Sequence, residues 1–222
     1  MPLVAYVGLV EPLALTSLAS PAQAGPMPFW ALLSSRVALC ALLGLLIAWR
    51  LACRGQPAAS IGWTARNAIV EALIGLPAAV AMFALTAMIG LWIVVYWPDW
   101  ARQAAQSHRG LLAAFPPMSM PQRVALSVFV ALAEELFFRG LLLHRLAVLC
   151  RQAPAAIALQ ALLFALPHAY EGITGVFMVF GLGLTLGGLT WWRGSLTAAI
   201  VGHAGFNTIQ LTLLDLFLRA GP

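Results

Sequence analysis

Long apolar runs are the feature that most restricts how this chain can fold. Six runs follow residue 28, at Phe29–Trp49, Asn67–Trp97, Gln122–Leu149, Pro154–Tyr170, Ile173–Trp192 and Leu196–Phe217. A helix needs about 20 apolar residues to cross the hydrocarbon core of a bilayer. Only 9% of the residues are charged, whereas soluble domains carry about 25%. We therefore predict an all-α polytopic membrane protein with about six transmembrane helices.

The loops divide the sequence into three parts. Residues 1–28 form a lead-in without the basic start of a secretory signal, residues 29–121 hold two spans and a polar loop, and residues 122–217 hold four spans. Short loops make consecutive helices antiparallel neighbours, so we predict a four-helix bundle at the C-terminal end. Small residues that permit close helix packing recur in the fifth span, at Gly181, Gly183, Gly187 and Gly188.

Arginine supplies all of the side-chain basic charge, because the chain contains no lysine. A net charge of +5 would suggest nucleic acid in a soluble protein, but these arginines flank apolar runs, so we expect lipid contact and no nucleic-acid partner. The side expected to face the cytoplasm carries Arg50, Arg54, Arg66, Arg145, Arg151 and Arg193. The lysine-free composition is typical of GC-rich bacterial genomes, so the predicted location is the bacterial inner (plasma) membrane, with several passes.

Three ionisable residues interrupt the third apolar run, at Glu134, Glu135 and Arg139. Charges within a span are costly and are kept mainly where they pair, line a cavity or do chemistry. Glu135 and Arg139 are four residues apart and share a helix face, so they can pair. Glu134 is rotated by about 100° from Glu135 and stays free to act. A structural ion pair with a spare glutamate is the alternative. Glu71 is interpreted as an interfacial charge close to Arg66.

Two later spans carry a second set of polar residues. His168 follows Phe164 by four positions, and Asn207 follows His203 by four, so each pair shares a helix face. A carboxylate can deprotonate water, and histidine and asparagine can donate to an oxyanion. Two histidines and a glutamate can also hold a divalent metal such as zinc. All of these arrangements serve the hydrolysis of an acyl bond.

Two common hydrolase motifs are absent, since the chain has neither His-Glu-x-x-His nor Gly-x-Ser-x-Gly. Instead, Glu134-Glu135-x-x-x-Arg139, Phe164-x-x-x-His168 and His203-x-x-x-Asn207 follow in order on successive apolar segments. Over residues 122–212 this arrangement resembles the CAAX-protease and bacteriocin-processing (CPBP) family, also called the Abi family.

The resemblance implies an intramembrane endopeptidase that hydrolyses a peptide bond of a membrane-associated protein or peptide. Eukaryotic members of the family remove the C-terminal tripeptide of prenylated proteins. By the resemblance, Glu134 is the general base, with Glu135 and Arg139 supporting it. His168, His203 and Asn207 would bind water, a metal or the oxyanion, and Phe164 would be a packing residue.

The resemblance leaves a metal-dependent and a metal-free mechanism open. A metal site would take His168, His203 and Glu134 as ligands, but a ligand glutamate is no longer a free base. This count of roles favours the metal-free scheme. Two other functions stay open: a non-enzymatic member that binds a peptide, as an immunity or scaffolding protein does, and a small transporter with a proton relay through Glu134 and the histidines.

Overall fold

Helices make up every regular element that the computed structural model describes, which covers residues 28–64, 67–102 and 116–219. Seven α-helices are α3 (Phe29–Cys53), α4 (Ala68–Tyr96), α6 (Met120–Glu135), α7 (His144–Cys150), α8 (Ala153–Ala165), α9 (Gly172–Arg193) and α10 (Thr197–Arg219). Three shorter elements are η2 (Ala58–Ile61), η3 (Leu136–Leu143) and η4 (Leu166–Glu171). The all-helical prediction is confirmed, while the predicted lead-in at 1–28 lies almost wholly outside the described residues.

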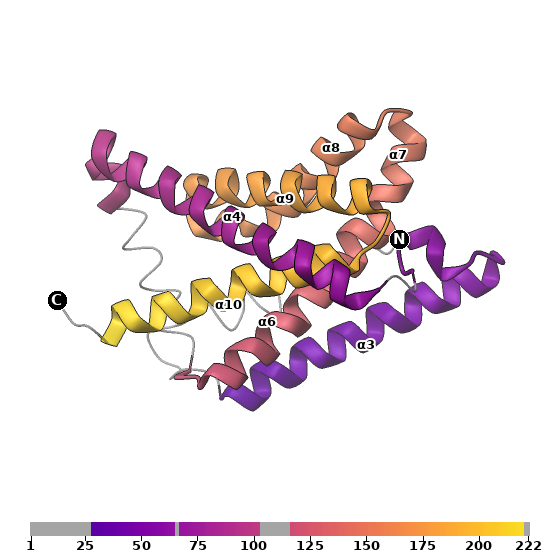
Figure 1. The fold of residues 1–222 in the computed structure, drawn as a ribbon, viewed down its shortest axis with the longest axis horizontal. Helices are drawn as coiled ribbons and strands as arrows, with labels where there is room; N and C mark the ends of the chain where they lie inside the picture. Colours follow the sequence, from indigo (N-terminus) through magenta and orange to yellow (C-terminus); the bar gives the residue numbers. More distant parts are fainter. Residues whose placement is uncertain (1–27, 65–66, 103–115, 220–222) are drawn as a thin grey trace.

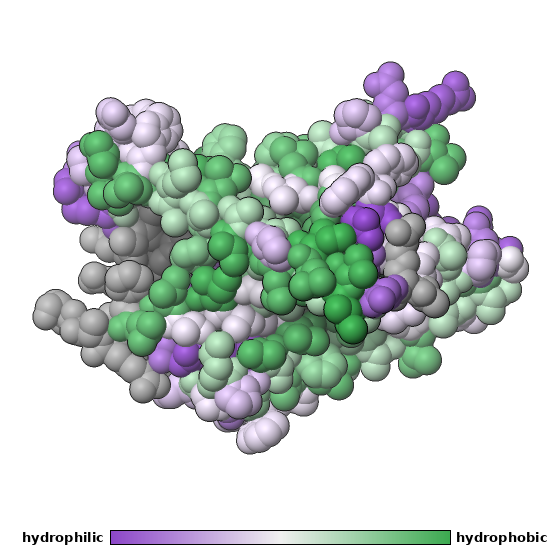
Figure 2. Space-filling view, viewed as in Figure 1, coloured by the Kyte–Doolittle hydropathy of each residue, from purple (hydrophilic) through white to green (hydrophobic). Residues whose placement is uncertain are grey.

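Three of the described helices, α3, α4 and α9, are long and apolar enough to cross a membrane. Figure 2 shows green apolar side chains spread over the visible face, where a soluble protein would present polar groups. On α4, for example, Leu73 and Met88 are 67% and 68% exposed. The expected count of six spans stays a prediction. The remaining helical segments are interrupted or carry the polar residues, which lowers their apolar content.

The helix α10 crosses the middle of the molecule and packs against both α4 and α6 (Figure 1). Glycine makes the contact with α4 possible. A Cβ atom on Gly75 would lie 2.6 Å from the Ala198 carbonyl oxygen, and one on Gly205 would lie 2.9 Å from the Ala79 Cβ. These distances are too short for real side chains. Close packing of small residues therefore holds the second predicted span against the last.

A second close contact joins α9 to α8. A Cβ atom on Gly183 would lie 2.8 Å from the Ala161 Cβ, and one on Gly187 would lie 2.7 Å from the Gln160 side-chain oxygen. Gly183 and Gly187 thus have the predicted packing role. Gly181 and Gly188 do not, because a Cβ atom on either would meet nothing within 4 Å. They lie on other faces of the same helix.

The helix type changes twice beside the polar residues. The third predicted span is helical throughout, but η3 is a π-helix rather than the expected α-helix. The fourth span ends as an α-helix at Ala165 and continues as the 3₁₀-helix η4, with Pro167 in its first turn. Proline lacks the amide donor that an α-helix needs, so a change of helix at this point is expected. Short π segments often occur at functional sites.

The first two predicted spans share their packing with the C-terminal segment. Leu39, Cys40 and Leu43 of α3 lie in one buried cluster with Phe137 and Phe164. The helix α3 packs against α6, and α4 packs against α10, so both predicted segments contribute to the same packed structure. The domain limits 29–121 and 122–217 stay a prediction.

Glu71 differs from its interpretation as an interfacial charge. Its side chain is 1% exposed and accepts a hydrogen bond from Arg193 Nη2 at 2.7 Å, which ties the start of α4 to the end of α9. Arg66 lies outside the described residues. A buried glutamate is kept charged most easily by a partner of opposite charge, and the fold brings that partner from a distant helix.

Candidate active site

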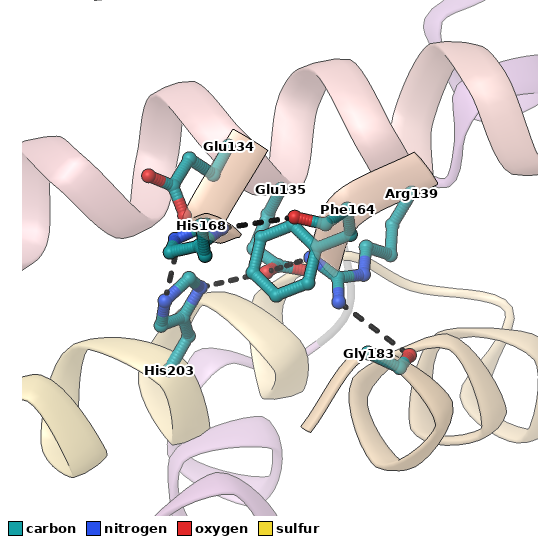
Figure 3. Close-up of polar contacts among 7 residues, drawn as sticks. All are labelled: Glu134, Glu135, Arg139, Phe164, His168, Gly183 and His203. Atoms are coloured by element: carbon teal, nitrogen blue, oxygen red, sulfur yellow. Dashed lines mark hydrogen bonds and ion pairs between the residues drawn. The ribbon is translucent and has the colours of Figure 1, made fainter. Parts of the chain in front are cut away.

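The acidic pair lies where α6 meets the π-helix η3 (Figure 3). Glu134 and Glu135 are the last two residues of α6, and Arg139 follows within η3. His168 comes from η4 and His203 from α10. The tertiary structure thus brings three separate helical segments together at these side chains.

Glu135 is the most enclosed member of the group, with no exposed side-chain surface. Its Oε1 atom accepts a hydrogen bond from Arg139 Nη1 at 2.7 Å, as the four-residue spacing predicts. The same oxygen lies 2.8 Å from His203 Nδ1. Two basic side chains therefore converge on one buried carboxylate. Since a carboxylate only accepts hydrogen bonds, the contact with His203 requires the proton on Nδ1.

Arg139 is itself wholly buried and has further contacts. Its guanidinium carbon lies 4.2 Å from the centre of the Phe164 ring, a cation–π arrangement. Its Nη2 donates a long hydrogen bond of 3.5 Å to the Gly183 carbonyl oxygen. The absence of a Cβ on Gly183 lets α9 approach closely enough for this contact. Arg139 is thus fixed by groups from α6, α8 and α9.

Glu134 has a different environment from its neighbour. Its side chain is 16% exposed, and its Oε2 lies 3.7 Å from His203 Nε2. That separation is too long for a direct hydrogen bond, but one water molecule can reach both atoms. Because His203 Nδ1 donates to Glu135, the Nε2 of the neutral ring is an acceptor. A water molecule at this position would meet one acceptor on Glu134 and one on His203.

His168 completes the group from the other side. Its Nδ1 lies 3.0 Å from the Phe164 carbonyl oxygen, so Nδ1 carries the proton in the neutral ring. The 3₁₀ pattern of η4 pairs each amide with the carbonyl three residues back, which leaves the Phe164 carbonyl available to the imidazole. Figure 3 shows the His168 ring lying between the Glu134 carboxylate and the His203 ring.

Phe164 is more than the packing residue that the sequence indicates. Its ring is 5.3 Å from the His168 ring and 6.0 Å from the His203 ring, the latter nearly perpendicular at 89°. It thus separates the buried Arg139 from the histidines while contacting all three. Two features of the sequence could have indicated these contacts: Phe164 lies four residues before His168, and the face of an aromatic ring suits a guanidinium.

Asn207 lies one helical turn beyond His203 on α10 and is half-buried. Within the described part of the chain its side chain makes no hydrogen bond. The structure therefore does not connect Asn207 to the other five predicted site residues by hydrogen bonds. Its predicted role in oxyanion binding depends on the bound substrate.

The metal-ligand set of His168, His203 and Glu134 stays a prediction. Among the residues that the structure describes, no group of three His, Cys, Asp or Glu side chains is placed to hold a metal ion. Catalytic zinc sites generally require three such ligands. Both histidines have Nδ1 held by an acceptor, the Phe164 carbonyl oxygen for His168 and Glu135 Oε1 for His203, and these contacts fix the orientation of each ring.

The comparisons with known proteins agree with the predicted resemblance. Residues 116–209 match the family described as type II CAAX prenyl endopeptidase, Rce1-like. No curated protein and no solved structure matches the chain. The matched segment includes both glutamates, Arg139, both histidines and Asn207. Residues 116–209 are thus similar to the CAAX protease (CPBP) family that the three motifs indicate.

Proposed function

We propose that this chain is an intramembrane endopeptidase that hydrolyses a peptide bond of a membrane-associated substrate by a glutamate-activated water. The family is a protease family, which supports the reaction class. The observation that carries the mechanism is the unequal placement of the two glutamates. Glu135 is enclosed and bonded to Arg139 and His203, whereas Glu134 is partly exposed beside His203 Nε2.

Glu134 is the general base in this scheme. It removes a proton from the water that its Oε2 shares with His203 Nε2, and the water oxygen attacks the carbonyl carbon of the scissile bond. The carbonyl oxygen then carries the negative charge. When the carbon–nitrogen bond breaks, Glu134 returns its proton to the leaving nitrogen, so both atoms and charges balance.

Glu135 and Arg139 are positioning residues. Glu135 holds His203 by the 2.8 Å contact to Nδ1, which fixes both the tautomer and the ring orientation. Arg139 pairs with Glu135 at 2.7 Å, and neither side chain reaches solvent. A histidine oriented by a buried carboxylate presents its other nitrogen in a defined direction, as in metal and triad sites.

Asn207, through its side-chain amide, and His168, in the form with both ring nitrogens protonated, are proposed to stabilise the oxyanion. His168 lies beside Glu134 and His203 (Figure 3), and Asn207 lies on α10 one turn from His203. Removal of one oxyanion donor in other hydrolases lowers kcat by about 10²–10³-fold. The same loss is expected for His168→Ala or Asn207→Ala.

The test compares strains that carry the wild-type chain or Glu134→Gln by proteomics of membrane-protein termini. We expect new C-terminal fragments that depend on Glu134. Purified protein is tested in parallel with a prenylated CAAX peptide and a panel of unmodified transmembrane peptides. Asp99→Asn is the matched control, because it removes an exposed carboxylate remote from the site. Equal fragment levels in the Glu134→Gln and wild-type strains would favour a non-enzymatic peptide-binding protein.

A further inference from the structure

Arginines gather at the end of the molecule where α3 finishes and α7 begins, and the proposed reaction does not use them. Arg50 lies in the last turn of α3 and Arg54 caps its end, while Arg145 is the second residue of α7. The positive charges of Arg50 and Arg54 act on that of Arg145. We call these three residues the basic cluster.

The fold holds the basic cluster together through apolar packing. Leu51 of α3 lies in one buried group with Ile61 of η2 and Leu136 of η3. This group anchors the end of α3 against the helix that continues into α7. Three like charges are therefore kept near one another, which costs free energy unless a negative group lies between them.

No carboxylate within the described ranges supplies that negative charge. The described ion pairs bring Glu71 to Arg193, Asp215 to Arg123 and Asp99 to Arg102, and the others lie in the active site. Arg145 Nη1 donates to the Leu141 carbonyl oxygen at 2.8 Å. Arg50 Nε is buried with no hydrogen-bond partner in the same part of the chain. No described carboxylate therefore neutralises the charge of the basic cluster.

The surroundings of the basic cluster are apolar and open. Val148 and Leu149, three and four residues after Arg145 on the same face of α7, are 80% and 75% exposed. Trp49 and Trp63 are 68% and 51% exposed. Exposed tryptophans are typical of the headgroup level of a bilayer. An anion that also carries acyl chains would contact both kinds of surface.

We propose that Arg50, Arg54 and Arg145 form a binding site for the phosphate headgroup of an anionic phospholipid, whose acyl chains lie along Val148 and Leu149. Guanidinium groups bind phosphate through paired hydrogen bonds. Basic sites between helices on the cytoplasmic side are known to hold anionic headgroups. Free phosphate shares the headgroup chemistry but gains nothing from the two aliphatic side chains.

The test measures lipid binding by the full chain in a neutral detergent. Phosphatidylglycerol, phosphatidylethanolamine and inorganic phosphate are added separately, and bound lipid is counted by native mass spectrometry alongside the Tm. We expect phosphatidylglycerol alone to remain bound and to raise the Tm. Each cluster arginine contributes enough that R50Q/R54Q should bind this lipid roughly 30-fold more weakly.

The control variant R36Q/R102Q removes the same charge from the opposite part of the molecule and should bind phosphatidylglycerol like the wild type. R50K/R54K keeps the charge and should lose only a few-fold. Should R50Q/R54Q fail to fold, R54Q is compared with R102Q, with a roughly fivefold loss expected for R54Q alone. Equal affinities in the cluster and control variants would overturn the site. A Tm shift reproduced by inorganic phosphate would overturn the lipid as its ligand. Glu134→Gln should bind lipid normally, so the outcome is independent of the proposed protease activity.

Discussion

Replacing Arg139 by alanine tests whether the buried ion pair holds the site together. The substitution removes the 2.7 Å contact to Glu135 and the cation–π contact with Phe164, and it leaves a carboxylate with no exposed surface. Breaking one side of a buried pair costs about 3–5 kcal/mol in soluble proteins. His203 still bonds Glu135, so we expect the lower half of that range for the charge. The lost cation–π contact adds about 1–2 kcal/mol.

The assay is thermal unfolding in detergent, followed by tryptophan fluorescence. For a chain of this size, the resulting loss of about 4–6 kcal/mol corresponds to a Tm decrease of roughly 8–24 °C. Arg102→Ala is the matched control, because its pair with Asp99 is 68% and 88% exposed, and its loss should change the stability by less than about 1 kcal/mol. The double variant Arg139→Met with Glu135→Gln removes both charges and should recover part of the loss.

If Arg139→Ala and Arg102→Ala unfold at the same temperature as the wild type, the buried pair contributes nothing, and the proposed positioning of His203 by Glu135 loses its support. A double variant that is less stable than Arg139→Ala alone would show that the stranded carboxylate is not the source of the loss.

Three further outcomes are expected. Glu134→Gln should abolish turnover with a Tm within about 1 °C of the wild type, because this side chain is partly exposed and its contact with His203 is long, at 3.7 Å. A large fall in Tm would assign it a structural role. Turnover should survive dialysis against a strong chelator without bound metal, and activity lost on chelation and restored by zinc would contradict the metal-free scheme. Gly75→Ala should cost about 1–3 kcal/mol, because its Cβ would lie 2.6 Å from a backbone oxygen, whereas Gly90→Ala meets nothing within 4 Å and should be neutral. Equal Tm values for both glycine variants would argue against close packing of α4 on α10.

Local spacing was sufficient to predict several features of the site. Glu135 and Arg139 lie on one helix and are four residues apart, so their pairing follows from helix geometry, and the π-helix preserves it. The same holds for the proximity of Phe164 and His168. The helical class follows from the long apolar runs. In lipid, an open sheet edge would leave backbone N–H and C=O groups without hydrogen-bond partners, whereas a helix pairs them internally. The order of the three motifs was enough to indicate the family.

The sequence alone determined which residues share a helix face, and the tertiary structure decided which faces meet. The contacts from His203 to Glu135 and from Arg193 to Glu71 span 68 and 122 positions of the chain. Helix periodicity carries no information on the rotation of one helix against another, which depends on close contacts such as that of Gly183 with Ala161. The π-helix and the release of the Phe164 carbonyl also depend on packing. From spacing alone, the division of labour between Glu134 and Glu135 was a hypothesis. The burial of Glu135 and the partial exposure of Glu134 depend on how the helices pack.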